Sequence, residues 1–292
     1  MQVTQLADVA PRPRRVAVGE FDGVHLGHRE VISGADTVLT FEPHPLSVVA
    51  PARAPRLLTS LAVKAELIAS LGVSELVVIP FDEEFAARSP QAFIEEILLA
   101  RLQSTHVSVG ENFRFGRDQS GDTRMLSAER RFDTRVVRLV EVEGEIVSST
   151  HIRALVEAGE VDIAARFLGA PFQLRGEVVH GDKRGRTLGF PTANLIPDES
   201  LVCPGNGVYV ARCGEACAAV NVGVRPTFGM GLALLVEAYL LDTTEDLYGR
   251  ELRLEFLTRL RGERRFGSAE ALIAQMDRDV ADTRAWWVAH AA

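Results

Sequence analysis

The chain has 292 residues, of which 47% are hydrophobic and 25% charged, and its formal net charge is -8. This length predicts about two globular domains, and the acidic balance argues against broad nucleic-acid binding. No apolar run approaches the roughly 18 residues of a membrane span, and the first residues lack the apolar core of a signal peptide. We therefore expect a cytoplasmic protein with no nucleic-acid, membrane or obligate protein partner.

The first half of the chain alternates strand and helix patterns. Strands separated by helices imply a parallel sheet with βαβ crossovers, and ligands of such sheets gather at the carboxyl ends of the strands. The predicted strands cover 16–18, 37–41, 76–79, 107–110 and 135–140, and the predicted helices cover 61–70 and 90–102, the second capped by Ser89.

Residues 19–28, Gly-Glu-Phe-Asp-Gly-Val-His-Leu-Gly-His, follow the strand predicted at 16–18. The backbone N–H groups of such a turn and the dipole of the following helix favour a bound phosphate. His25 and His28 share a face if the helix begins near Val24, and two imidazoles there suggest stabilisation of a nucleotidyl-transfer transition state. The alternative is a Gly-rich turn with two surface histidines. Gly19, Gly23 and Gly27 would let the backbone approach the phosphate closely.

Other polar clusters follow later strands of the predicted sheet. Residues 42–45 and the pair Glu111–Asn112 come directly after two strands, so we expect them to meet the 19–28 turn at one edge. Three hydroxyls and an arginine at a later helix start form a second anion-site candidate, although an ordinary helix cap explains them equally well. These four residues are Ser148, Ser149, Thr150 and Arg153.

The pattern changes after a helical stretch at 152–168. Gly169-Ala170-Pro171 interrupts it, and short strands between Gly-rich turns follow, which predicts an antiparallel sheet that is closed or sandwiched. We place the domain boundary there, giving domains 1–170 and 171–292, with a final helix at 269–287 capped by Ser268. The predicted strands cover 172–180, 208–213, 218–222, 235–241 and 252–260.

A basic, Gly-rich stretch runs from residue 181 to residue 195. Thr192 and Asn194 alternate by two, so on a strand they lie on one side, and their oxygens suit magnesium carried by nucleotide phosphates. The alternative is a basic hairpin loop followed by an ordinary strand. The loop itself can wrap a polyphosphate with backbone donors and positive charge, through Gly181, Lys183, Arg184, Gly185 and Arg186.

Glu237 stands in a predicted strand among apolar neighbours. A carboxylate in a domain with a phosphate loop could accept a proton from a substrate hydroxyl. The alternative is a strand glutamate that faces solvent. We expect Glu251 and Glu255, by contrast, to occupy solvated strand positions.

Over nearly its whole length the chain resembles the bacterial bifunctional riboflavin kinase/FAD synthetase family. The resemblance is carried by the 19–28 turn, the Phe-Glu-Pro-His-Pro segment at 41–45, residues 110–116, the 184–195 loop and residues 221–228. It implies an α/β protein with an N-terminal Rossmann-like nucleotidyltransferase domain built on a parallel sheet. A C-terminal antiparallel β-barrel flavokinase domain with a closing C-terminal helix would follow.

The resemblance implies two reactions that use ATP as co-substrate with Mg²⁺. Riboflavin would be phosphorylated to FMN, with Glu237 as the base and with Thr192 and Asn194 helping to hold magnesium. FMN would then be adenylylated to FAD, with His25 and His28 steadying the transferring phosphoryl group. The implied nucleotide- and phosphate-binding residues are Gly19, Phe21, Asp22, Gly23, Gly27, Asn112, Ser148, Ser149, Thr150 and Arg153, and in the second domain Gly181, Lys183, Arg184, Gly185 and Arg186.

One segment departs from the family pattern. Only residues 29–36 separate His28 from the next predicted strand, whereas a crossover normally takes about a dozen residues or more. The helix there must be about two turns long, which leaves open a monofunctional riboflavin kinase with a degenerate adenylyltransferase domain. A flavin-binding regulator and a different small-molecule nucleotidyltransferase are further alternatives, and the intact motifs of both domains argue against them.

Overall fold

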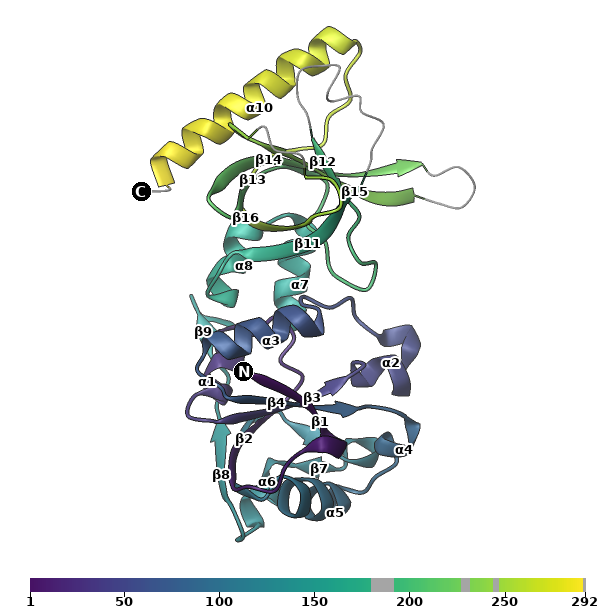
Figure 1. The fold of residues 1–292 in the computed structure, drawn as a ribbon, viewed down its shortest axis with the longest axis vertical. Coiled ribbons are helices and arrows are strands. Elements are labelled where there is room, and N and C mark those ends of the chain that lie inside the picture. Colours follow the sequence, from purple (N-terminus) through teal and green to yellow (C-terminus); the bar gives the residue numbers. More distant parts are fainter. Residues whose placement is uncertain (180–191, 227–231, 244–246, 291–292) are drawn as a thin grey trace. The chain divides into compact units, whose positions relative to one another are not determined.

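The structure is a computed structural model that describes residues 1–179, 192–226, 232–243 and 247–290. The chain divides into an N-terminal unit, Met1–Ser149, and a C-terminal unit, Thr150–Ala292 (Figure 1). Across the described residues, no helix combines the length and the apolar character needed to cross a bilayer.

The N-terminal unit is built on a parallel six-stranded sheet, which confirms the predicted fold class. Its order is β1-β4-β3-β2-β5-β8, and all neighbouring pairs are parallel. The chain moves from β2 to β3 on one side and later returns to place β5 on the other, so a topological switch lies between β2 and β5. The strands are β1 (Gln2–Gln5), β2 (Arg14–Val18), β3 (Thr37–Glu42), β4 (Glu75–Pro80), β5 (Ser104–Gly110) and β8 (Asp133–Val137).

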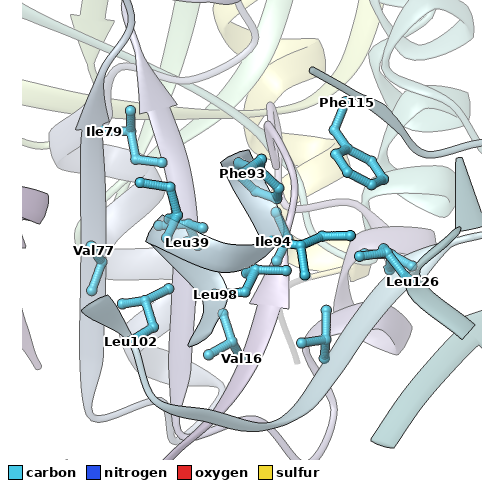
Figure 2. Close-up of a cluster of buried hydrophobic side chains, with 14 of the residues drawn as sticks. Val16, Leu39, Val77, Ile79, Phe93, Ile94, Leu98, Leu102, Phe115 and Leu126 are labelled. Carbon is cyan, nitrogen blue, oxygen red and sulfur yellow. The ribbon is translucent and has the colours of Figure 1, made fainter. Parts of the chain in front are cut away.

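Helices cover both faces of this sheet. Alternate residues of β2 point to opposite faces, as the strand period requires. Val16 and Val18 pack with the helix at 93–101, and Ala17 packs with α1 and α3. Figure 2 shows the first of these clusters. The larger helices are α1 (Leu26–Ile32), α3 (Leu61–Ser70), α5 (Pro90–Ala92) continuing as η3 (Phe93–Arg101), and α6 (Thr123–Ala128).

Short helices and strands complete the N-terminal unit. They are η1 (Leu6–Asp8), α2 (Pro45–Val49), η2 (Pro51–Arg53), α4 (Glu83–Ala86), η4 (Arg117–Gln119), β6 (Arg114–Phe115), β7 (Gly121–Asp122), β9 (Glu141–Val142) and β10 (Glu145–Ile146).

The crossover helix α1 is short, as the sequence predicted. It has seven residues, or about two turns. The predicted start near Val24 was wrong by two residues, because Val24 has a φ of 43°, which a right-handed helix does not accept. His25 is instead the N-cap, and its Nδ1 accepts a hydrogen bond from the backbone N–H of His28 at 3.2 Å.

The C-terminal unit contains a closed barrel of six strands in the order β11-β12-β15-β14-β13-β16. All the described pairs are antiparallel, and helix α10 packs its Val280, Trp286 and Trp287 on a barrel cluster around Cys217. The predicted barrel and closing helix are therefore confirmed. The elements are α7 (Ser149–Ala158), α8 (Val161–Leu168), β11 (Phe172–Val179), β12 (Ala193–Leu195), β13 (Gly207–Cys213), β14 (Ala216–Pro226), β15 (Leu232–Leu240), β16 (Glu251–Gly262) and α10 (Ala269–His290).

Helices α7 and α8 are attached to the barrel. Helix α8 buries Val161, Ala164, Phe167 and Leu168 and contacts β16 and β11. The end of α7 is held by backbone hydrogen bonding from Gly205. The division at Ser149/Thr150 thus places both helices with the barrel, and the sequence-based boundary at 170/171 stays a prediction about where a fragment can be cut.

We expect a fragment of residues 172–292 to fold but to be less stable than a fragment of residues 150–292. Phe167 and Leu168 are 3% and 6% exposed, and burying each stabilises by roughly 1.5–3 kcal/mol. Urea unfolding followed by the fluorescence of Trp286 and Trp287 would measure the difference. Equal midpoints and equal slopes in the two fragments would show that the hairpin of α7 and α8 adds nothing to the barrel.

Candidate active sites

The turn between β2 and α1 has a strained backbone. Phe21 and Val24 have φ values of 51° and 43°, a left-handed conformation that is an outlier for bulky residues. Each such residue costs about 1–3 kcal/mol and persists only where its surroundings fix it, which occurs most often at functional sites. Both side chains are 1% exposed, so the core fixes them. Gly23, with a φ of 83°, occupies the same region without strain.

Asp22 ties this turn to the segment that leads into α3. Its Oδ1 accepts hydrogen bonds from the backbone N–H groups of Leu58 at 2.8 Å and Thr59 at 3.1 Å. The backbone N–H of Gly23 donates to Thr59 Oγ1 at 3.1 Å, and Ser149 Oγ donates to the carbonyl of Asp22 at 3.0 Å. The side chains of Phe21 and Asp22 therefore hold the turn in shape, and their predicted contact with nucleotide stays a prediction.

His25 and His28 lie together, although the helix that was expected to carry both begins only at Leu26. Their rings stack with centroids 3.5 Å apart, and Phe21 meets the His28 ring edge-on at 5.4 Å. A Cβ at Gly27 would lie 3.2 Å from the His25 ring, so a larger residue here would require that ring to shift by a few tenths of an ångström. Burial first, then the charges of His25 and Lys64, hold the pKa of His28 well below its usual value. His28 is therefore neutral near pH 7, and its Nδ1 is buried with no hydrogen-bond partner among the described residues.

The other predicted residues of this site lie at or near helix and strand ends. Gly19 and Asn112 follow β2 and β5, the strands on either side of the switch point. Residues 42–45 follow β3, so these three clusters lie at the same edge of the sheet. Ser148 precedes α7, while Thr150 and Arg153 belong to the C-terminal unit, where Arg153 Nη2 donates to Thr150 Oγ1 at 3.3 Å.

Two charged residues near the turn were missed from the sequence. Glu20 is half-buried, and burial raises its pKa to about 8. The charge of Lys64 opposes that rise, and those of Asp22 and Glu42 add to it. Lys64 lies in α3 and is only 3% exposed. The available signal was a lysine at a core-facing position of the helical pattern, next to Val63 and four residues before Ile68.

We expect replacement of Glu20 by Gln to stabilise the N-terminal unit at alkaline pH. With a folded pKa of about 8 and an ordinary value of 4.5, the folded state binds more protons than the unfolded chain between these values. The free energy of unfolding therefore falls as pH rises through that window. A Gln cannot ionise, so its Tm advantage over wild type should grow from about pH 6 to about pH 9.

This transition can be observed separately, because all tryptophans and tyrosines lie after residue 150. Tryptophan fluorescence follows the C-terminal unit, and circular dichroism follows both units. A Tm difference between wild type and Glu20→Gln that stays constant with pH would contradict the assignment.

The second site is a row of polar side chains across three barrel strands. Asn194 of β12 pairs with Glu237 of β15, which pairs with Asn221 of β14. Asn221 Nδ2 donates to Glu237 Oε2 at 3.4 Å. Val236 and Ala238, on either side of Glu237, are fully buried, so Glu237 lies on the opposite, outer face of β15. The structure thus places Glu237 beside Asn194, two residues that belong to separate sequence motifs.

The Oδ1 atom of Asn194 fits a magnesium ligand. It is buried, and no hydrogen-bond donor among the described residues reaches it, while Asn194 Nδ2 donates to the carbonyl of Thr192 at 3.4 Å. A buried carbonyl oxygen without a partner is costly unless a ligand satisfies it. In the described part of the chain, no group of three His, Cys, Asp or Glu side chains could hold a metal ion. The predicted loop residues Gly181, Lys183, Arg184, Gly185 and Arg186 lie outside the described residues.

Known proteins match both units. The family model for FAD synthetase matches residues 8–151, and that for riboflavin kinase matches residues 168–287. A bifunctional riboflavin kinase/FMN adenylyltransferase of Listeria monocytogenes is 39% identical, covering 93% of this chain and 92% of the relative. The chain belongs to the bifunctional riboflavin kinase/FMN adenylyltransferase family. The Escherichia coli K12 member is 38% identical, with 90% of each chain covered.

A solved structure resembles this chain across both of its units. A crystal structure from Streptococcus pneumoniae, described as a macrolide-efflux protein, is 30% identical with a TM-score of 0.88. The match covers 97% of this chain and 99% of that chain. The predicted resemblance is therefore confirmed, and the presence of both family models disfavours a monofunctional kinase.

Proposed function

We propose that this chain makes FMN from riboflavin and ATP in its C-terminal unit, and then FAD from FMN and ATP in its N-terminal unit. The observation that carries the proposal is that each unit matches its own family model and holds its own polar site. Riboflavin, FMN and ATP are thus the small-molecule substrates, with magnesium accompanying ATP.

In the kinase reaction, Glu237 accepts the proton of the ribityl 5′-hydroxyl as its oxygen attacks the γ-phosphorus of ATP, and ADP leaves. Asn221, which donates to Glu237, orients the carboxylate toward the substrate. Thr192 and Asn194 would hold magnesium, which neutralises phosphate charge when bound. General-base catalysis of this kind contributes about 10²–10⁴-fold.

In the adenylyl transfer, a phosphate oxygen of FMN attacks the α-phosphorus of ATP and the bond to pyrophosphate breaks. Negative charge between the two anionic reactants must be stabilised, so positioning and hydrogen-bond donors dominate the rate. A neutral His28 offers one ring N–H to a phosphate oxygen, and its stacking on His25 fixes the ring. The Gly19–His28 turn adds backbone donors at the start of α1.

The direct test is incubation with riboflavin, ATP and Mg²⁺, followed by separation of riboflavin, FMN and FAD. We expect FMN to appear first and FAD to follow. Helix α1 is short, so it offers less surface for packing against the nucleotide or flavin. It keeps its first turn, where the helix dipole acts. Adenylylation should therefore survive, with a higher KM as the main effect. Brisk FMN formation without FAD would favour the monofunctional alternative.

The cellular setting belongs to the same proposal. The formal net charge of -8 disfavours nucleic-acid partners. We place the reactions in the cytoplasm, where riboflavin and ATP would both be available to the chain.

A further inference from the structure

Lysine is nearly absent from this chain. Only Lys64 and Lys183 occur, and all its other Lys and Arg residues are arginines. Lys183 belongs to the basic, Gly-rich stretch of the sequence that begins at residue 181, outside the described residues, whereas Lys64 belongs to none of the sequence motifs. A lone lysine in the N-terminal unit, at a buried position of α3, needs a physical reason.

Lys64 differs from the other buried charged residues because no ion pair or side-chain hydrogen bond is seen for it among the described residues. A buried charge is costly unless it is paired, and the described part of the chain otherwise follows this rule. Arg14 pairs with Glu75, Glu255 pairs with Arg212 and Arg253, Asp279 pairs with Arg261, and Asp22 accepts backbone hydrogen bonds. Lys64 is 3% exposed, yet no ion pair or side-chain hydrogen bond joins it to any described residue.

The fold places Lys64 near the Gly19–His28 turn. Asp22 and Gly23 bind Leu58 and Thr59, and α3 begins two residues later with Ser60 as its N-cap. This places Lys64 in the first turns of the helix that is fastened to the turn. The charge of Lys64 accordingly acts on both Glu20 and His28.

The charge of Lys64 acts on Glu20, a carboxyl of the same turn. Burial raises the pKa of Glu20 to about 8, so this carboxyl is uncharged at neutral pH. A protonated Glu20 neither cancels the ammonium charge nor repels a phosphate. An anion bound at the turn would therefore meet the Lys64 charge without repulsion from Glu20.

We propose that Lys64 binds a phosphate group of the adenylyl-transfer reaction, beside His28. This inference rests on the proposed function of the Gly19–His28 turn. The ammonium stabilises negative charge that grows on the phosphates as the FMN oxygen attacks and pyrophosphate leaves. The bound phosphate could belong to the nucleotide or to FMN, and the experiment distinguishes these sources.

The near absence of lysine makes a spectroscopic test simple. Protein labelled with ¹³C-lysine gives two side-chain Cε signals, and the one that Lys64→Arg removes belongs to Lys64. Inorganic pyrophosphate and FMN are added separately, pyrophosphate at concentrations that inhibit FAD formation and FMN at concentrations that saturate it. A shift of the Lys64 signal with pyrophosphate assigns it to the nucleotide side, and a shift with FMN assigns it to the acceptor. No shift with either would overturn the proposal.

Kinetics give the second readout. We expect Lys64→Met to lower kcat/KM for FAD formation about 10- to 100-fold, the range for hydrogen bonds to charged groups. Lys64→Arg, which keeps the charge, should stay within about tenfold of wild type. Arg53→Met, which removes an exposed charge before α3, should match wild type, and riboflavin phosphorylation should be unchanged in all three variants.

The outcomes separate this inference from the proposed function. If Lys64→Met forms FAD like wild type while His28→Ala does not, Lys64 has no role and the turn keeps its function. If His28→Ala forms FAD normally, the site itself is wrong. If Lys64→Met does not fold, Lys64→Arg decides together with the lysine signal, because a purely structural lysine would not respond to pyrophosphate or FMN.

Discussion

Glu237→Gln abolishes riboflavin phosphorylation and leaves the conversion of supplied FMN to FAD near wild type. The amide keeps the shape of the side chain and its place opposite Asn194 and Asn221, but it cannot accept the hydroxyl proton. The expected loss is about 10²–10⁴-fold in kcat. Separate assays of FMN and FAD formation on one preparation measure both effects.

Glu251 supplies a matched control for this substitution. It lies on the barrel strand β16 and its side chain is 69% exposed, so Glu251→Gln removes a carboxylate from the same unit without touching the row around Glu237. We expect this variant to phosphorylate riboflavin normally. Full kinase activity in Glu237→Gln would remove Glu237 from the reaction.

His28→Ala has the converse effect, because FAD formation falls sharply while FMN formation persists. The substitution deletes the neutral ring that stacks on His25 and with it a donor to the transferring phosphoryl group. Losing one preorganised donor of this kind costs about 10²–10³-fold in kcat. Steady-state kinetics with FMN and ATP varied in turn would place the loss in kcat rather than in KM.

His106 is the control on the same sheet. It lies near the start of β5, its side chain is 42% exposed, and its Nε2 is 3.4 Å from Asp133. We expect His106→Ala to make FAD at the wild-type rate. Equal loss of both activities in a folded His28→Ala protein would show that the two sites are not independent.

Much of the fold follows from local patterns in the sequence. Apolar runs alternating with amphipathic segments predicted the parallel sheet, and short strands between Gly-rich turns predicted the barrel, because burial dictates these periods. Strand β1 was missed. Its sequence Gln-Val-Thr-Gln buries only Thr4, and it forms because β4 offers it an edge, which is a tertiary effect.

The site residues likewise fall into those that local motifs predict and those that depend on tertiary contacts. Motif residues such as His25, His28 and Asn194 could be predicted because the chemistry shows in their spacing. Glu255 could not. It was expected to be solvated, and the structure instead buries it between Arg212 of β13 and Arg253 of β16. Such pairings depend on the register between strands far apart in the chain. The position of Lys64 near the turn depends likewise on the hydrogen bonds that join the turn to the segment before α3.

One chain carries two independent sites, and mixing the two variants is the sharpest test of their independence. Glu237→Gln and His28→Ala are each incubated with riboflavin, ATP and Mg²⁺, alone and together, and FAD is measured. Alone, neither variant should form FAD at an appreciable rate, because one lacks FMN and the other cannot adenylylate it. Together they should form FAD, since FMN released by His28→Ala is a substrate for Glu237→Gln. A mixture that forms no FAD, although both variants are folded, would show that the two sites do not work independently.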